Sequence, residues 1–377
     1  MCGIVGFTGK KDLKKLDVLL STIEHRGRDE RVVDYVSQIN LGMNRLSIND
    51  LRINIFPFKY KKYTLIFNGE IYNYSNLKNK LIKKKVELKT SCDAEVILPL
   101  YDIYGIDFLK YIEGMFALAI VDENKKTVIL ARDRMGEKPL YYSSCDDNLV
   151  FASEMKVLMK YFGKSMEIDN KKIGEYFYNG FVSDGGTVIK NINKIPAAHY
   201  LIYDLEKKLL ELKKYWSPEI KKINENEKYL IEKLDKLIEE SVNERLLSDV
   251  PVGCFLSGGV DSSLIAYFAS KRLKNMSVFS VSFPGQEAHD EIKYATLVAK
   301  KLGVKQEIIE CNSENVRELI GNIGKLIDEP IADMAVILTY LLAKKARESI
   351  KVVLTGEGAD ELFGGYDRYR REILKNK

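Results

Sequence analysis

The second residue of the chain is a cysteine, Cys2, which becomes the N-terminal residue once Met1 is removed. A cysteine in that place carries a nucleophile and a base together. Its thiol can attack, and its free α-amine, with an ordinary pKa of about 8, can take up and return the proton. No histidine partner is needed, and none forms an obvious pair with a cysteine among His25, His199 and His289. Cys2 is therefore a candidate nucleophile, although its position alone does not indicate a substrate.

A run of serines and glycines at 257–263, Ser-Gly-Gly-Val-Asp-Ser-Ser, lies between an apolar strand pattern and a helix pattern. The glycines let the backbone approach an anion closely, and a helix N-terminus offers unpaired N–H groups and a positive dipole end. The serines add hydroxyl donors, and Asp261 is placed to hold Mg²⁺. The run predicts a pyrophosphate site, with a simple helix-capping turn as the alternative.

A second acidic signature follows the apolar run 352–354. It reads Thr355-Gly356-Glu357 and continues to Asp360 and Glu361. Ligands of open α/β sheets bind at the carboxyl ends of the strands, so we expect these acids to face the site that the run 257–263 opens. Carboxylates beside a triphosphate can hold Mg²⁺ or act as acid and base toward an incoming amine.

Two regions of different character must position these groups. Residues 1–205 hold short β-rich runs bounded by turn signals, with helical patterns at 13–23 and 94–104, which predicts a mainly β domain. Residues 206–227 are rich in Lys, Glu and Asn, and we interpret them as a linker. From 228 to 377 an amphipathic helix (228–247) precedes alternating strands and helices, which predicts a parallel sheet with helices on both faces. The apolar positions on one face of that helix are 230, 234, 237, 238, 242 and 246.

Length and composition define the broad class. A chain of 377 residues with 46% hydrophobic and 30% charged residues is expected to form two globular domains. The longest apolar run, 334–343, is too short to span a bilayer. The first residues lack a basic stretch followed by an apolar core, so we expect no secretory signal. Five cysteines without a CxxC pair favour a reducing compartment. The net charge of +5 is spread along the chain. We therefore expect a cytoplasmic protein with no membrane or nucleic-acid partner.

Taken together, the motifs resemble the glutamine-hydrolysing asparagine synthetase family, in which a class II glutamine amidotransferase is fused to a synthetase domain. The resemblance covers nearly the whole chain. Its motifs are Met-Cys-Gly-Ile at 1–4, His-Arg-Gly at 25–27, Asn-Arg-Leu-Ser-Ile at 44–48, Asn-Gly-Glu-Ile-Tyr-Asn at 68–73, Asp-Ala-Glu-Val-Ile at 93–97, Gly-Met-Phe-Ala at 114–117, Arg-Asp-Arg-Met-Gly at 132–136, Lys-Pro-Leu-Tyr at 138–141, Phe-Ala-Ser-Glu at 151–154, Asp-Val-Pro-Val-Gly at 249–253 and the two signatures above. The fold it implies is an α+β N-terminal-nucleophile (αββα) glutaminase domain over 1–205, then an α/β, parallel-sheet, ATP-pyrophosphatase-like synthetase domain over 228–377.

The resemblance gives the first domain its chemistry. It implies that Cys2 attacks the side-chain amide of glutamine, which releases ammonia and leaves a thioester that water cleaves. Asn68 and the backbone N–H of Gly69 would form the oxyanion hole. A guanidinium suits the α-carboxylate of glutamine, and acids suit its α-ammonium or neighbouring groups. The residues implied to bind glutamine in this way are Arg45, Glu70 and Asp93.

The same resemblance implies that the second domain adenylylates a carboxylate with ATP, with aspartate as the family's usual acceptor, and that ammonia reaches it through an interior route. The implied ATP-binding residues are Leu256, Ser257, Gly258, Gly259, Asp261, Ser262, Ser263, Val281, Thr355 and Gly356. Glu357 and Asp360 would act at the reaction centre, and Asp261 and Asp360 would hold Mg²⁺.

Three departures from the family pattern keep alternatives open. Position 28 is Arg where Pro is usual, residues 305–307 lack two histidines common in the family, and the chain ends at Lys377 where the family continues. We therefore expect an incomplete synthetase domain, and a homodimer or a second chain that completes it stays open. The run 329–335 resembles a branch that amidates other carboxylates, including surface-polysaccharide sugar acids. A stand-alone glutaminase and a non-catalytic scaffold are the remaining alternatives.

Overall fold

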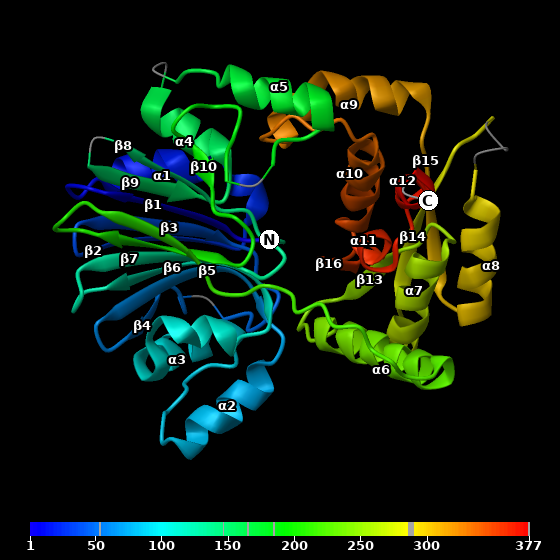
Figure 1. The fold of residues 1–377 in the computed structure, drawn as a ribbon, viewed down its shortest axis with the longest axis horizontal. Helices are drawn as coiled ribbons and strands as arrows, with labels where there is room; N and C mark the ends of the chain where they lie inside the picture. The colour runs from blue at the N-terminus through cyan, green and yellow to red at the C-terminus, as the bar shows by residue number, and fades with distance from the viewer. Residues whose placement is uncertain (53, 146, 164–165, 184, 286–289, 376–377) are drawn as a thin grey trace. The chain divides into compact units, whose positions relative to one another are not determined.

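The computed structural model describes the whole chain except residues 53, 146, 164–165, 184, 286–289 and 376–377 (Figure 1). It divides into two compact units. The first contains Met1–Lys222 and Gly324–Ala332, and the second contains Ile223–Ile323 and Asp333–Lys377. The segment 324–332 thus belongs to the first unit although both its neighbours in sequence belong to the second. No helix within the described ranges is long and apolar enough to cross a membrane.

Two antiparallel sheets form the centre of the first unit, each with six strands among the described residues. The first sheet has the order β10-β8-β9-β1-β3-β2, with β1 (Gly3–Thr8), β2 (Glu30–Val36), β3 (Ile39–Arg45), β8 (Tyr141–Cys145), β9 (Asn148–Ala152) and β10 (Asn193–Lys194). The second has the order β12-β11-β7-β6-β5-β4, with β4 (Phe58–Tyr60), β5 (Tyr63–Ile71), β6 (Gly114–Asp122), β7 (Thr127–Arg132), β11 (His199–Asp204) and β12 (Leu210–Lys214).

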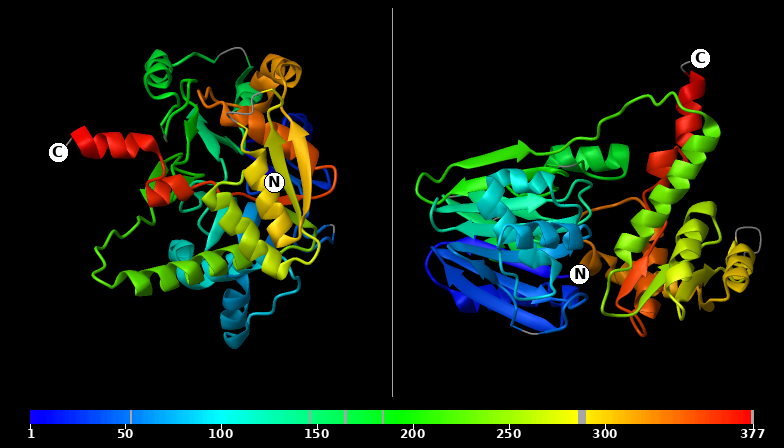
Figure 2. Two further views of the ribbon diagram at one scale, coloured as in Figure 1. Left: turned by 90° about the vertical axis from the view of Figure 1, so that its right-hand side faces the viewer. Right: turned by 90° about the horizontal axis from the view of Figure 1, so that it is seen from below.

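Helices cover the outer face of each sheet. Side chains alternate along β1, so that Ile4 enters the core between the sheets while Val5 and Phe7 pack against helices. The helices on the first sheet are α1 (Leu13–Ser21) and α4 (Met155–Phe162), and those on the second are α2 (Tyr74–Lys83) and α3 (Ile97–Tyr104) (Figures 1 and 2). The remaining helices of this unit are η1 (Glu24–Arg26), η2 (Asp93–Val96), η3 (Gly105–Lys110) and α5 (Asn170–Asn179). The predicted αββα class is confirmed.

The second unit is built on a parallel sheet of order β15-β14-β13-β16. Its strands are β13 (Val252–Phe255), β14 (Ser277–Ser282), β15 (Lys305–Glu310) and β16 (Val352–Leu354). Its helices are α6 (Glu227–Arg245), α7 (Val260–Arg272), α8 (Ile292–Leu302), α10 (Ala335–Ala346), α11 (Ala359–Phe363), α12 (Asp367–Lys375) and α9 (Ser313–Leu326), the last residues of which belong to the first unit. One core joins Cys254 and Val278 to Phe268 of α7, and another joins Phe279 to Ala346 of α10. Helices therefore cover both faces of the sheet, as predicted.

Two details correct the predictions from sequence. The predicted linker 206–227 is wrong over 210–214, which form β12 and pair with β11. This is an edge strand with most of its side chains exposed, so its composition resembles that of a linker. Helix α6 has the predicted amphipathic pattern, yet Val242 is its one fully buried position, while Leu234 and Leu237 are 39% and 52% exposed.

Candidate functional site

A pocket in the first unit gathers the six residues predicted to hydrolyse and bind glutamine. They are Cys2, directly before β1, Arg45 of β3, Asn68, Gly69 and Glu70 of β5, and Asp93 of η2. The sequence analysis missed several other lining residues: Leu46, Ile48, Asn49, Phe56, Phe67, Cys92, Met115 and Lys138. Leu46, Ile48, Met115 and Lys138 lie inside motifs already noted, which was the available signal.

The nucleophile candidate, Cys2, lies directly before β1. The backbone N–H of Leu46 donates to Cys2 Sγ at 3.4 Å, and Arg26 Nε donates to the carbonyl oxygen of Cys2 at 3.0 Å. The backbone of Leu46 thus holds the thiol of Cys2, and the side chain of Arg26 holds its backbone carbonyl. Burial lowers the pKa of the Met1 amine, which directly precedes Cys2, to about 6. An uncharged amine can accept the proton of a neighbouring thiol.

Asn68 and Gly69 are consecutive residues of β5 that pair with β6. Asn68 is 1% exposed, and its Nδ2 is buried without a hydrogen-bond acceptor among the described residues. A Cβ at Gly69 would lie 2.1 Å from the carbonyl oxygen of Met115, so only glycine fits against β6 here. Leaving a buried donor unpaired is unfavourable by about 1–3 kcal/mol. The arrangement therefore presents an amide donor to whatever occupies the pocket.

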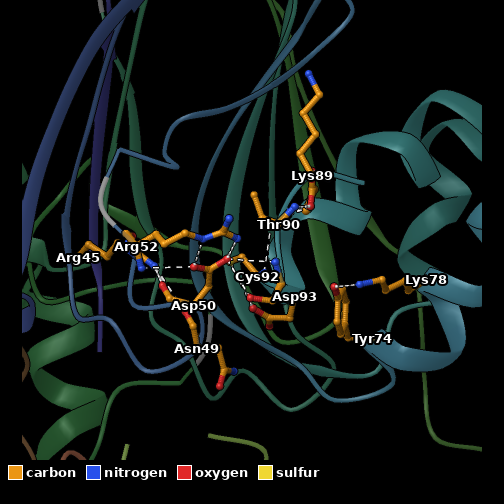
Figure 3. Close-up of polar contacts among 12 residues, drawn as sticks. Arg45, Asn49, Asp50, Arg52, Tyr74, Lys78, Lys89, Thr90, Cys92 and Asp93 are labelled. Carbon is orange, nitrogen blue, oxygen red and sulfur yellow. Dashed lines mark hydrogen bonds and ion pairs between the residues drawn. The ribbon is translucent and has the colours of Figure 1, made fainter. Parts of the chain in front are cut away.

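Arg45 is held by the chain itself. Its guanidinium donates to the backbone carbonyls of Asn49, Asp50 and Arg52 (Figure 3). It also forms an ion pair with Glu30 at 3.3 Å. An incoming carboxylate must therefore replace some of these carbonyls before it can bind the guanidinium. The role predicted for Arg45 stays a prediction.

A network beside Arg45 connects two loops around the pocket. The buried Asp50 carboxylate accepts from the Arg52 guanidinium and from both the backbone N–H and the hydroxyl of Ser91, each Ser91 bond being 3.0 Å (Figure 3). The Arg52 hydrogen bond, followed by those from Ser91, holds the pKa of Asp50 well below its usual range. Residues 50–52 and 91–93 are thereby held together on one side of the pocket.

Two acids complete the pocket. Glu70 and Asp93 are 9% and 8% exposed. The backbone N–H of Ile71 donates to Asp93 at 2.5 Å, yet burial dominates and raises the pKa of Asp93 to about 6. An ammonium group placed beside Asp93 would favour its ionised form, which fits the predicted contact with the α-ammonium of glutamine without testing it.

In the second unit, the run 257–263 forms the turn from β13 into α7. Ser257 Oγ lies 3.0 Å from Ser262 Oγ, and the Gly259 N–H donates to Ser257 Oγ at 3.3 Å. Gly258 has φ +91°, and a Cβ there would lie 2.5 Å from the backbone N of Ala295. The buried Ser263 Oγ has no hydrogen-bond partner in the described part of the chain. A close-packed turn at a helix N-terminus with an unpaired hydroxyl is suited to an anion.

The second signature lies against this turn. Strand β16 pairs in parallel with β13, and a Cβ at Gly356 would lie 2.9 Å from the backbone N of Ser262. The structure thus brings Gly356 to the run 257–263. The other predicted ATP-binding residues lie on neighbouring elements, with Leu256 directly after β13, Val281 on β14 and Thr355 directly after β16.

The predicted metal ligands are Asp261, in the first turn of α7, and Asp360, in α11. Within the described residues no group of three or more His, Cys, Asp or Glu side chains is placed to hold a metal ion. Mg²⁺ commonly takes one or two carboxylates together with substrate phosphates. The role of Asp261 and Asp360 as metal ligands stays a prediction.

Comparisons with known proteins agree with the two units. A family model described as a glutamine amidotransferase domain matches residues 1–216, and one described as asparagine synthase matches residues 233–377. Asparagine synthetase [glutamine-hydrolyzing] 1 of Bacillus subtilis is 35% identical over 99% of this chain and 60% of its own length. A putative asparagine synthetase [glutamine-hydrolyzing] 2 of Methanocaldococcus jannaschii is 35% identical over 100% of this chain and 78% of its own length.

The chain thus spans 60% of the length of the B. subtilis relative. Among solved structures, a glutamine phosphoribosylpyrophosphate amidotransferase from B. subtilis aligns with 84% of this chain and 70% of its own, at 16% identity and a TM-score of 0.44. A likeness at that level carries no argument about function.

Proposed function

This chain belongs to the glutamine-hydrolysing asparagine synthetase family, and we propose that it is an ATP-dependent carbon–nitrogen ligase that takes its nitrogen from glutamine. Aspartate is the acceptor proposed first. One observation carries the proposal: six residues spread from position 2 to position 93 line one pocket, with a buried amide donor beside a half-buried thiol.

The proposed chemistry of the first unit needs only its own residues and water. With Met1 removed, the Cys2 amine takes the thiol proton, and Sγ attacks the side-chain amide carbon of glutamine. Asn68 Nδ2 and the Gly69 N–H donate to the oxygen that becomes negative. The proton then passes to the leaving nitrogen, ammonia departs, and water cleaves the thioester to glutamate and free Cys2.

The second unit is proposed to bind ATP at the run 257–263, with Glu357 and Asp360 at the reaction centre. The carboxylate oxygen of the acceptor attacks the α-phosphorus and pyrophosphate leaves. Ammonia then attacks the acyl carbon and AMP leaves. Mg²⁺, where bound, would neutralise charge on the phosphates, and Asp261 and Asp360 are the residues that would hold it.

The test measures glutamate release and ATP–pyrophosphate exchange on the same purified chain. We expect exchange that depends on an added carboxylate, aspartate first and then a series of sugar acids. Cys2→Ala should abolish glutamate release and leave exchange intact, and Asp261→Asn should do the reverse. Folded protein that releases glutamate but shows no exchange with any carboxylate would refute the ligase and leave a glutaminase.

A further inference from the structure

The segment 324–332 is docked on the first unit by two adjacent acids. The Asp328 carboxylate accepts a hydrogen bond from the backbone N–H of Met155, the first residue of α4. Glu329 accepts from the hydroxyl of Tyr141 at 2.5 Å and forms an ion pair with Lys194 at 2.8 Å. Both acids are largely removed from solvent, with their side chains 9% and 14% exposed.

The Asp328 side chain caps the N-terminus of α4. The residue in the N-cap position, Glu154, makes no capping hydrogen bond with its side chain. A helix N-terminus favours a negative charge, and here the charge comes from a residue more than 170 positions away. The start of α4 therefore depends on the segment 324–332.

The side chain of Glu154 instead forms contacts that lead toward Cys2. Its carboxylate contacts Lys156 Nζ at 2.8 Å, His25 Nε2 at 2.8 Å and Arg26 at 2.9 Å. Arg26 in turn donates from Nε to the carbonyl oxygen of Cys2 at 3.0 Å. The side chains of Arg26 and Glu154 are each 9% exposed. Little solvent is therefore available to replace either partner.

Lys156 joins the two halves of this chain of contacts. Its ammonium lies 2.8 Å from Glu154 and 3.2 Å from Asp328, between two buried carboxylates. Although burial opposes it, the contacts with His25, Lys156 and Arg26 lower the pKa of Glu154 to about 2. Burial raises the pKa of Asp328. Removing either partner of Lys156 would leave a buried charge poorly compensated.

We infer that Asp328 and Lys156 are positioning residues for the nucleophile. They fix Glu154 at the start of α4, Glu154 fixes Arg26, and Arg26 fixes the backbone of Cys2. The inference rests on the proposed hydrolysis of glutamine. Release of Asp328 from α4 would therefore loosen this series of contacts and slow hydrolysis at Cys2. The segment 324–332 that carries Asp328 continues at both ends into residues of the second unit.

The matched test compares two neighbouring truncations, Asp328→Ala and Glu329→Ala. Both remove a docked carboxylate from the same segment, but only Asp328 leads to Cys2. We expect Asp328→Ala to lower kcat for glutamate release about 10- to 100-fold, since a small misplacement of a reacting group has effects of this size. The KM for glutamine should change less than about twofold. Glu329→Ala should leave kcat within about twofold of wild type. It should lower Tm by about as much as Asp328→Ala does.

A second readout does not require glutamine turnover. The alkylation rate of Cys2 by iodoacetamide, followed by mass spectrometry of the N-terminal peptide, should fall in Asp328→Ala and in Lys156→Met but not in Glu329→Ala. The double variant Asp328→Ala/Lys156→Met should be no slower than the worse single variant, because both act through one chain of contacts. If Asp328→Ala does not fold, Lys156→Met is read in the same assays.

Three results would overturn the inference. They are equal losses of kcat in the two truncations, a kcat within twofold of wild type in Asp328→Ala or Lys156→Met, and additive losses in the double variant. Wild-type protein that releases no glutamate would instead refute the proposed hydrolysis, and the alkylation rates would then still decide whether Asp328 positions Cys2.

Discussion

The unpaired amide of Asn68 makes the sharpest prediction about the glutamine site. Its Nδ2 is buried without an acceptor among the described residues, so the folded protein bears an unfavourable term of about 1–3 kcal/mol there. If that donor serves the oxyanion, Asn68→Ala should lower kcat for glutamate release about 100- to 1000-fold, which corresponds to about 2.7–4 kcal/mol. The same substitution removes the unpaired donor, so Tm should stay level or rise.

Asn40 provides the matched control. It is also a fully buried asparagine on a central strand, but its side chain is satisfied: Oδ1 accepts from the Asp12 N–H at 2.8 Å, and Nδ2 donates to the Lys10 carbonyl at 3.0 Å. Asn40→Ala loses both bonds, which should lower the free energy of unfolding by about 1–3 kcal/mol. At about 2–4 °C per kcal/mol the fall in Tm is measurable by calorimetry. Its kcat should stay within about twofold of wild type.

The two substitutions should therefore have opposite effects. Asn68→Ala should lose activity and keep stability, and Asn40→Ala should lose stability and keep activity. The reasoning is refuted if Asn68→Ala lowers Tm as much as Asn40→Ala does and retains more than about a third of wild-type kcat. That result would mean that Asn68 is a structural residue whose partner forms only in solution.

Two further predictions concern Asp93 and Gly356. Burial raises the pKa of Asp93 from 3.8 to about 6, so the contribution of Asp93 to stability is fully present below pH 4 and is lost as pH rises through 6. Asp93→Asn should therefore flatten this part of the curve of unfolding free energy against pH, by up to about 3 kcal/mol as measured by urea titration. The same variant should raise the KM for glutamine. An unchanged curve would contradict the assignment. Gly356→Ala should weaken ATP–pyrophosphate exchange at least about 10-fold and leave glutamate release unchanged, because its Cβ would meet Ser262; equal loss of both activities would show a general folding defect instead.

Much of the fold could be predicted because its signals are local. Alternating strand and helix patterns after residue 250 indicated the parallel sheet, and β-rich runs with turns indicated the first unit. Strand β12 was missed for an equally local reason. Strand β12 has a neighbouring strand on one side only, and most of its side chains are exposed. Its residues Glu211, Lys213 and Lys214 therefore resemble those of a linker, although Leu212 pairs with Leu201.

The pocket around Cys2 was predictable as a set of residues but not as an arrangement. Cys2, Asn68 and Asp93 belong to recognisable motifs, and the structure places all three on one pocket. The contacts of Arg45 could not be foreseen, because its partners are backbone carbonyls, which every residue carries. The same holds for Asn68, where the informative property is the lack of an acceptor, and this lack depends on residues distant in sequence.

The assignment of the segment 324–332 to the first unit could not be predicted from its position in the sequence. The segment contains the last residues of α9 and part of the connection to α10, and a reading along the chain assigns it to the second unit. Its membership in the first unit depends on side chains of Tyr141, Lys156 and Lys194 that have no pattern in common. Two buried acids would be unfavourable here without those partners. The two acids and these three partners therefore stabilise one another only while the segment contacts the rest of the first unit. Loss of that contact would remove all of these interactions together. The Asp328→Ala and Lys156→Met variants measure what loss of that contact does to Cys2.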